Sequence, residues 1–231
     1  MLEIKDLAKT YGRKIALEIP ELKIEANEII GLVGNNGAGK TTLMSLILDL
    51  IEARKGTVLS KGEPVAKSEH WKSYTSAFMG ESFLIPFLKV EEYLQFIQNL
   101  HGISTQDYEA FKTRMASFFS EGFNSNTLIR DLSLGNKNKV GIMGALLPKS
   151  ELVLLDEPFA NLDPSSQFQL KKLIQEHKAM HQSCIMVSSH DLGHVSELSD
   201  RILLIESGQI IKDSREKGQF KSELEQYFVE K

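Results

Sequence analysis

Residues 34–41 read "GNNGAGKT", and this short stretch constrains the fold more than any other part of the sequence. It follows the continuous apolar run "EIIGLVG". It precedes a stripe of apolar residues at helical spacing, formed by Leu43, Leu46, Ile47, Leu50 and Ile51. Glycines let backbone N–H groups curl around an anion, and a helix that follows presents its positive end to the same anion. The order strand, glycine loop, helix therefore predicts an α/β domain with a phosphate-binding loop.

The loop matches the pattern G-x-x-x-x-G-K followed by Ser or Thr. We expect its backbone to bind phosphate groups through Gly34, Asn35, Asn36, Gly37, Ala38 and Gly39. Lys40 is expected to reach the β- and γ-phosphates, Thr41 to ligate Mg²⁺ through its hydroxyl, and Thr42 to lie on the α-phosphate side. A plain glycine turn is the alternative, and the strand and helix around the loop argue against it. The loop thus predicts a site for a nucleoside triphosphate.

Two acidic residues follow another apolar run, "ELVLLDE", which ends in Asp156 and Glu157. A strand of this kind delivers both carboxylates to the carboxyl edge of a sheet. We expect Asp156 to hold Mg²⁺ through its water shell, and Glu157 to orient and polarise the water that attacks the γ-phosphate. Two solvated acids at a strand end are the alternative, which the phosphate loop disfavours.

Composition excludes several classes of protein. The 231 residues are 42% hydrophobic and carry a formal net charge of −4, with no long basic stripe, so nucleic acid is not an expected partner. The single Cys184 lies in the apolar run "SCIMVSS", which predicts a buried thiol and excludes an intrachain disulfide. No apolar run approaches the roughly 18 residues that a membrane helix needs, and the N-terminus lacks a signal-peptide layout. We therefore expect a cytoplasmic protein that reaches a membrane only through a partner.

The order of apolar patterns predicts how the chain is organised. Alternation at Leu2, Ile4, Ile15, Leu17, Ile19, Leu22 and Ile24 predicts antiparallel strands near the N-terminus. Helical stripes follow at Val90, Tyr93, Leu94 and Ile97, and at Tyr108, Phe111, Met115, Phe118 and Phe119. Later apolar runs predict further strands, "ESGQ" predicts a hairpin turn, and the charged tail from Asp213 to Lys231 predicts a surface helix.

These patterns predict a mainly parallel α/β core interrupted by a helical insertion. We assign residues 1–82 and 149–231 to the core, which includes the antiparallel β part, and residues 83–148 to the helical part. The His177/His181 and His190/His194 pairs stand at i, i+4, but neither has an HExxH glutamate or an evident third ligand, so we expect no metal site there.

The stretch "DLSLGNKNKV" begins a helix unfavourably, whereas the apolar residues Val140, Met143 and Leu147 continue it at helical spacing. Ser133 can serve as an N-cap, but Gly135 costs the first turn roughly 1 kcal/mol relative to Ala. Requirements other than helix stability must therefore have chosen these residues.

Taken in order, the motifs resemble those of the ATP-binding cassette family over nearly the whole chain. "GNNGAGKT" is similar to its Walker A loop, "LSLGN" to its LSGGQ signature, "LVLLDEP" to its Walker B strand, "ANLD" to its D-loop and "SSHD" to its switch-histidine region. The resemblance implies a P-loop NTPase core of the RecA-like type, ATPase activity, and ATP and Mg²⁺ as ligands.

The resemblance also implies roles for single residues. Tyr11 in "KTYGRKIAL" takes the position that stacks on adenine, and His190 takes that of the switch histidine that contacts the γ-phosphate. With Glu157 and Lys40, His190 completes the catalytic set that we predict. Asp163 in "ANLD" would link two catalytic sites. Ser133 and Gly135 would approach the γ-phosphate bound to an opposite subunit.

Two departures from the family pattern stand out. Glu81 in "AFMGESF" occupies the place of the Q-loop glutamine, where its carboxylate can still ligate Mg²⁺. Leu134 stands where the signature usually has glycine, and Asn136 where it has glutamine. Because Ser133 and Gly135 are retained, we expect an active signature.

The resemblance therefore implies an ATPase subunit that dimerises head to tail around two ATP molecules, with another copy or with a paired ATPase subunit. Separate transmembrane subunits of a transporter would dock near Glu81 and the helical part and hold the protein at the cytoplasmic face of the membrane. The form "LSLGNK" resembles exporter-type cassettes more than sugar importers.

A soluble cassette ATPase, for example in metal-cluster assembly, is the alternative. A P-loop kinase would leave the signature unexplained. The transported substrate would be recognised by the membrane partner and leaves no mark on this sequence.

Overall fold

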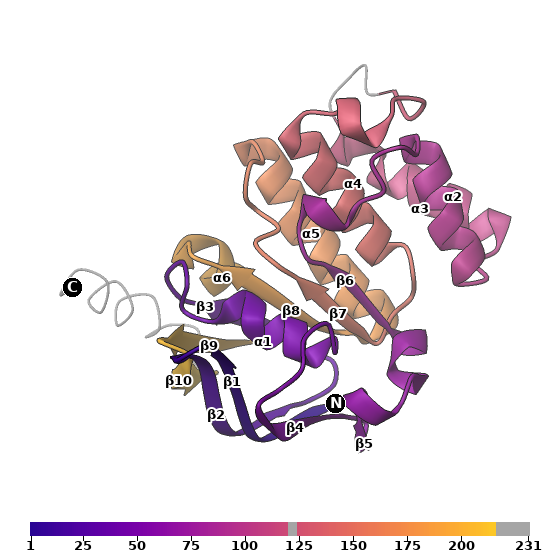
Figure 1. Cartoon of the computed structure of the whole chain (residues 1–231). Coiled ribbons are helices and arrows are strands. Elements are labelled where there is room, and N and C mark those ends of the chain that lie inside the picture. Colours follow the sequence, from indigo (N-terminus) through magenta and orange to yellow (C-terminus); the bar gives the residue numbers. More distant parts are fainter. Residues whose placement is uncertain (120–123, 216–231) are drawn as a thin grey trace.

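The computed structural model describes residues 1–119 and 124–215, and these residues form two β-sheets and a group of helices (Figure 1). A four-stranded antiparallel sheet has the order β2-β1-β4-β5. Its strands are β1 Leu2–Tyr11, β2 Lys14–Ile24, β4 Lys55–Ser60 and β5 Glu63–Pro64. The N-terminal antiparallel strands that the alternation predicted are thereby confirmed.

Ile15 departs from the predicted alternation, because it is 52% exposed. The register between β1 and β2 shifts at Lys9 and Thr10, where Thr10 pairs with Ile15 and Lys9 pairs with Leu17. A bulge of this kind breaks the period of two, so residues on its two sides face differently. The expectation that Ile15 is buried with Leu17 was therefore wrong, and Ile15 lies instead at the rim of a pocket.

The second sheet has six strands in the order β10-β9-β3-β8-β7-β6. The strands are β3 Ile29–Val33, β6 Thr75–Phe78, β7 Leu152–Leu155, β8 Cys184–Ser189, β9 Arg201–Glu206 and β10 Gln209–Ser214. Neighbours from β6 to β9 run parallel, and β10 returns antiparallel to β9. This confirms the mainly parallel core and the hairpin turn at "ESGQ".

The predicted surface helix from Asp213 to Lys231 was wrong at its start. Asp213 and Ser214 pair with β9 as the end of β10, and Asp213 accepts two hydrogen bonds from the buried Arg201, at 2.7 and 2.6 Å. The charged residues after Asp213 suggested a surface helix. The strand is instead held by the ion pair between Asp213 and Arg201, which are 12 residues apart in the sequence. Residues 216–231 of the predicted helix lie outside the described residues.

Helix α1 Lys40–Ile47 ends one turn earlier than the apolar stripe predicted. Asp49 adopts a left-handed conformation with φ of 51°. The N–H of Leu50 donates to the carbonyl of Ser45 at 2.9 Å, and the N–H of Asp49 donates to that of Leu46 at 3.3 Å. These two bonds close the helix in a Schellman motif. The extension to Leu50 and Ile51 was therefore wrong, and Leu50 is exposed.

The two larger hydrophobic cores lie on opposite faces of the six-stranded sheet. On one face, Ile30, Leu32 and Cys184 pack with α1 and the four-stranded sheet. On the other face, strand residues such as Val153 and Val187 pack against helices. Burial raises the pKa of the Cys184 thiol to about 12, and the predicted buried thiol is confirmed. Alternate residues of each parallel strand thus serve different cores, which accounts for their continuous apolar runs.

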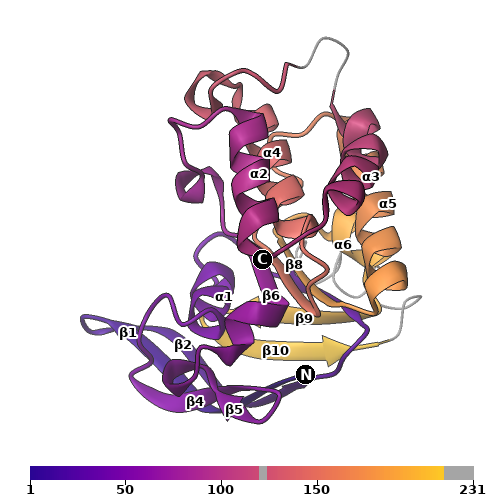
Figure 2. The same ribbon diagram turned by 90° about the vertical axis from the view of Figure 1, so that its right-hand side faces the viewer.

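The segment between β6 and β7 is mostly helical, as predicted, and it stands to one side of the sheets (Figure 2). Its helices are α2 Val90–Leu100, α3 Thr105–Met115 and α4 Leu134–Leu146. Two further helices lie outside this segment: α5 Pro164–His181 follows β7, and α6 Leu192–Leu198 follows β8. Short 3-10 turns span Val65–Lys67, His70–Tyr74, Glu81–Phe83, Ala116–Phe118 and Ile129–Asp131. The second predicted stripe extends past α3, because Phe118 lies in such a turn and Phe119 follows it.

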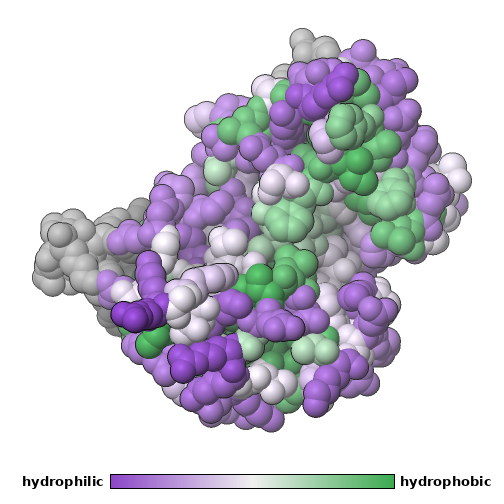
Figure 3. Space-filling model, viewed as in Figure 1, coloured by the Kyte–Doolittle hydropathy of each residue, from purple (hydrophilic) through white to green (hydrophobic). Residues whose placement is uncertain are grey.

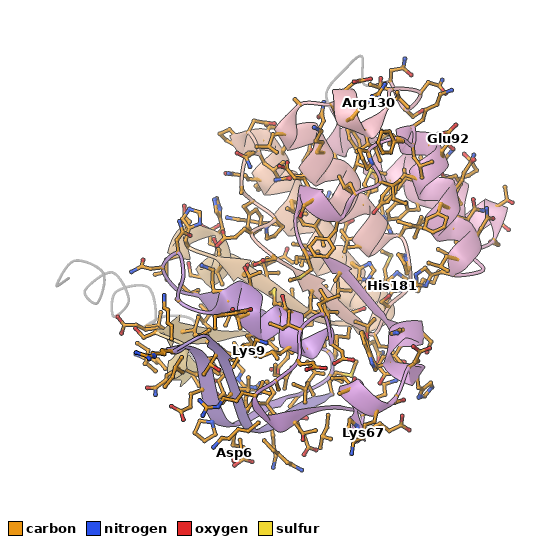
Figure 4. All side chains as sticks on the ribbon, viewed as in Figure 1. Asp6, Lys9, Lys67, Glu92, Arg130 and His181 are labelled. Atoms are coloured by element: carbon orange, nitrogen blue, oxygen red, sulfur yellow. The ribbon has the colours of Figure 1, made fainter. Side chains whose placement is uncertain are left out.

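Charged side chains cover the outside of both parts. Asp6 and Lys67 lie on the outer side of the part that holds the four-stranded sheet, whereas Glu92 and Arg130 lie at the far end of the helical part (Figure 4). Among the residues that the structure describes, no helix is both long and apolar enough to cross a membrane.

Candidate functional site

The glycine loop connects β3 to α1, as the sequence predicted. Gly39 precedes the first residue of the helix with φ of 114°, and a Cβ atom added there would lie 3.0 Å from the carbonyl oxygen of Ala16. Only glycine combines that backbone conformation with such a close neighbour. The loop therefore wraps around the start of α1 with its backbone facing an open pocket.

This pocket has a volume of about 540 Å³. Of the residues predicted to bind nucleotide or act on it, it is lined by Tyr11, Gly34, Asn35, Asn36, Gly37, Ala38, Gly39, Lys40, Thr41, Thr42 and Glu157. Tyr11 is 54% exposed at the end of β1, so one face of its ring is accessible to a flat ligand. Loop, helix start and aromatic ring thus surround one cavity.

Sequence reasoning missed several other residues of the pocket wall. Lys14 and Ala16 come from the start of β2, and residues 204–207 come from the end of β9 and the turn that follows it. Gly208 joins these segments, because its N–H donates to the carbonyl of Ala38 and its carbonyl accepts from the N–H of Glu18, each at 2.8 Å. The motif "ESGQ" signalled a turn, but only the strand order brings that turn to the phosphate loop.

Lys40 and Glu157 form an ion pair inside the pocket. The Lys40 Nζ lies 3.1 Å from Glu157 Oε1 and donates to the carbonyl of Gly34 at 2.6 Å. The lysine side chain is only 6% exposed. A buried ammonium needs such partners, because removing it from water is costly. The cation is therefore held at the centre of the loop, where a phosphate group could take over these contacts.

Thr41 and Asp156 meet beside this pair. The Thr41 hydroxyl donates to Asp156 Oδ2 at 2.6 Å, and the Ser188 hydroxyl donates to Asp156 Oδ1 at 2.5 Å. Hydroxyl and carboxylate oxygens are the ligands that Mg²⁺ prefers in proteins, so this donor set fits the ion. Glu81, the third predicted Mg²⁺ ligand, lies outside the pocket on an exposed 3-10 turn.

Glu157 is also in contact with His190. The His190 Nδ1 lies 2.9 Å from Glu157 Oε2, and the backbone N–H of His190 donates to the same oxygen at 3.4 Å. Glu157 adopts φ of 47°, which is unusual for a residue other than glycine. The backbone thus turns sharply after β7 and aims the carboxylate between Lys40 and His190. The three residues that were predicted to be catalytic are brought together.

Ser133 and Gly135 lie elsewhere, at the start of α4. The Ser133 hydroxyl accepts from the N–H of Asn136 at 3.3 Å, which confirms the predicted N-cap. Neither residue lines the pocket, and the neighbouring Leu134 is 43% exposed. The positive end of α4 is therefore open at the surface.

The loop after Glu157 supports the start of α4. A Cβ atom added at Gly135 would lie 2.6 Å from the carbonyl oxygen of Asn161, and the side chain of Asn138 donates to the carbonyl of Ala160 at 2.8 Å. This close approach supplies a reason for the glycine that disfavours the helix start.

Asp163 ends this loop and caps α5. It accepts from the N–H of Ser166 at 2.9 Å and from its hydroxyl at 2.6 Å. These hydrogen bonds lower the pKa of Asp163 to about 2. Lys139 Nζ, buried on α4, lies 3.7 Å from the same carboxylate.

Comparison with known proteins gives consistent results. A family model described as ABC transporter matches residues 17–160. An uncharacterized ABC transporter ATP-binding protein of Bacillus subtilis (strain 168), YhaQ, is 35% identical over 213 residues, which cover 90% of this chain and 69% of that protein. The solved structure of an ATP-binding subunit of an ABC transporter is 27% identical, with a TM-score of 0.87 over 100% of this chain and 98% of that one.

A second solved structure shares the fold at 21% identity, with a TM-score of 0.82 over 93% of this chain and 98% of that one. It is a dimeric ATP-binding cassette in a post-hydrolysis state, bound to ADP and Pi.

Proposed function

Because the chain belongs to the ABC transporter family and is an ATPase, we propose that two copies join head to tail around two ATP molecules and drive transport through separate membrane subunits. One observation carries this proposal. The residues that resemble the signature, Ser133 and Gly135, lie at an exposed helix start outside the pocket of their own chain. A second copy can supply them to that pocket, and one solved cassette that shares this fold is itself dimeric.

Within one pocket, the loop backbone and Lys40 would bind the phosphates, and Tyr11 would stack on the adenine. Thr41 and Asp156 would hold Mg²⁺, which neutralises charge on the β- and γ-phosphates when bound. The fit of these two residues rests on the 2.6 Å hydrogen bond that already joins them. Glu81 stays a predicted ligand whose side chain would have to approach from outside the pocket.

The carboxylate of Glu157 would accept a proton from the attacking water. Lys40 now pairs with it at 3.1 Å, and the γ-phosphate is the stronger anion for that ammonium. We propose that ATP takes over the lysine, which leaves Glu157 Oε1 facing the water while His190 holds Oε2. Because the contact between Glu157 and His190 is already formed, little reorganisation of the carboxylate is needed at the moment of reaction.

The membrane partner is proposed to dock on the helical part. Large apolar side chains are exposed there at Phe83, Ile85, Phe87, Phe96 and Leu100. They come from the 3-10 turn Glu81–Phe83, from the segment that joins this turn to α2, and from α2 itself, where apolar residues gather on the face seen in Figure 3. An apolar surface beside the Q-loop position suits the cytoplasmic end of a membrane subunit. Export is the direction that the form "LSLGNK" favours.

Replacing Glu157 by Gln tests the dimer. The substitution removes the proposed proton acceptor but keeps the size of the side chain, so ATP should stay intact between two copies. We expect a stable dimer on size-exclusion chromatography with ATP and Mg²⁺, and hydrolysis at least about 10²-fold slower than in the wild type.

The same variant with ADP is the control and should remain monomeric. A variant that stays monomeric at saturating ATP contradicts the head-to-tail arrangement.

Purification of the ATP-bound dimer from membranes should then carry transmembrane subunits with it, whereas recovery of soluble scaffold proteins alone would contradict the transport role.

A further inference from the structure

We propose that Ser188 is a positioning residue that fixes both acidic residues of the nucleotide site through a single hydroxyl group. This inference rests on the proposed roles of Asp156 and Glu157 and extends them to a residue outside the pocket lining. Ser188 lies on β8, is fully buried, and lines no part of the pocket.

The hydroxyl of Ser188 makes two hydrogen bonds of opposite kind. It accepts from the backbone N–H of Glu157 at 2.8 Å and donates to Asp156 Oδ1 at 2.5 Å. An N–H group can only donate, so the oxygen must accept there and direct its own hydrogen towards Asp156. The geometry thereby determines the direction of the Ser188 hydroxyl hydrogen, which points at Asp156 Oδ1.

Asp156 is held from two sides as a result. Thr41 donates to Oδ2 at 2.6 Å while Ser188 donates to Oδ1. A carboxylate with both oxygens bonded cannot rotate freely about its last torsion. Thr41 and Asp156 would hold Mg²⁺, and Ser188 would keep the Asp156 carboxylate in the orientation that places Oδ2 beside Thr41. Partners behind a metal ligand commonly contribute in this way.

Glu157 is held through its backbone. The N–H of Asp156 makes the last regular bond of the sheet at this point, to the carbonyl of Phe78 at 2.8 Å. The chain then turns into the left-handed conformation of Glu157, which costs about 1–2 kcal/mol for a residue with a side chain. The Ser188 oxygen gives the next N–H a partner where the strand ladder stops, and so stabilises the turn that aims the Glu157 carboxylate.

Replacing Ser188 by Ala tests this inference. We expect kcat to fall by about 10- to 100-fold, and the Mg²⁺ concentration for half-maximal tightening of fluorescent ATP-analogue binding to rise by a similar factor. Binding of the same analogue without Mg²⁺ should change by less than about threefold, because the phosphate loop and Lys40 are untouched. A merely structural role would weaken both kinds of binding together.

Two further variants complete the test. Ser188→Thr keeps the hydroxyl on a strand that suits a β-branched residue, and it should restore both quantities to within about threefold of the wild type. Ser183→Ala is the matched control, because Ser183 is equally buried and donates to the carbonyl of Ser150 at 2.6 Å, at the opposite end of β8. It should lower thermal stability without changing Mg²⁺ dependence.

Unchanged kcat and Mg²⁺ dependence in a folded Ser188→Ala protein would overturn the inference. If that variant does not fold, Ser188→Cys decides the matter. Its weaker hydrogen bonds should give an intermediate loss, and wild-type values would overturn the inference. A wild-type protein without Mg²⁺-dependent ATP hydrolysis would instead refute the proposed function, which separates the two failures.

Discussion

The nucleotide pocket and the start of α4 carry the two halves of the proposed ATP site, and they are built in opposite ways. In and beside the pocket, Lys40 pairs with Glu157 at 3.1 Å and Thr41 with Asp156 at 2.6 Å. At the start of α4, the Ser133 hydroxyl bonds only weakly with the next turn of its own helix, at 3.3 Å, and faces solvent.

This difference suggests which half is ready before ATP arrives. A site whose groups already hold each other pays little to order them when ligand binds. An open helix start gains a partner only when an anion reaches it. The two halves are nevertheless connected, since the loop after Glu157 packs against Gly135 and Asn138. Docking of a second copy at α4 can therefore change the position of the Glu157 carboxylate in the same chain.

The largest effect on ATPase rate is expected from mixing two inactive variants, one altered in the pocket and one altered at the start of α4. Lys40→Met disables the pocket, whereas Ser133→Asp keeps the N-cap but places a negative charge against the partner's γ-phosphate. Each variant alone should lose about 10³-fold in ATPase rate, by analogy with residues supplied in trans. An equimolar mixture should recover about a quarter of the wild-type rate, because half of the dimers then hold one intact site.

The recovery should depend on concentration, since only dimers contribute. A mixture that remains as inactive as its components contradicts a site shared between two chains, and full activity of Ser133→Asp alone contradicts the role given to the signature. Circular dichroism of each variant checks that both chains are folded.

Replacing Gly135 by Ala probes the contact between the halves. The new Cβ atom would lie 2.6 Å from a backbone oxygen, so α4 and the loop at Asn161 must move apart. Overpacking costs about 1–3 kcal/mol, and better helix propensity returns about 1 kcal/mol, so we expect a net loss of about 1 kcal/mol in the free energy of unfolding. Urea unfolding measures it.

Asn136→Ala, one residue further along α4, is the control for that experiment. It brings a somewhat smaller gain in helix propensity without the steric contact, and it should not destabilise the chain. A Gly135→Ala chain more stable than the wild type would show that the two elements are not tightly packed.

Replacing Asp163 by Ala should lower the free energy of unfolding by about 1 kcal/mol, the usual loss for an N-cap. The carboxylate is 59% exposed, so solvent screens its interactions and limits what they add to stability. Because the pKa is lowered to about 2, the contribution is present above pH 4 and disappears as the pH falls towards 2. Urea unfolding at pH 7 and at lower pH measures both.

Ser104→Ala is the matched control, since Ser104 caps α3 through the N–H of Asp107 at 3.1 Å. Both variants should lose similar stability, but only Asp163→Ala should weaken the ATP-dependent dimer. Equal dimer formation by the two would contradict the predicted link between catalytic sites.

The parts of the site that depend on local order could be predicted from the sequence. The phosphate loop, the carboxylates after β7 and His190 after β8 all follow buried strands, and the ends of neighbouring parallel strands meet at one edge of a sheet. Their proximity therefore follows from the pattern alone.

Other parts depend on register or on distant strands and could not be predicted. Ala16 and the turn at Gly208 reach the pocket because of a bulge in β2 and the place of β9 beside β3. Ser188 meets Asp156 only because of how β8 is aligned with β7. Glu81 stays a predicted ligand, and its position on an exposed turn outside the pocket could not be predicted from the motif order.

The burial of Cys184 has a practical consequence. The thiol is inaccessible, its pKa is raised to about 12, and it is the only cysteine among the 231 residues. Thiol reagents at neutral pH should therefore not react with Cys184 in the folded chain. A cysteine introduced on the surface, for example near the start of α4, would carry a fluorescent or spin label at one defined place. The approach of two copies could then be followed as a distance in solution, without first removing any native residue.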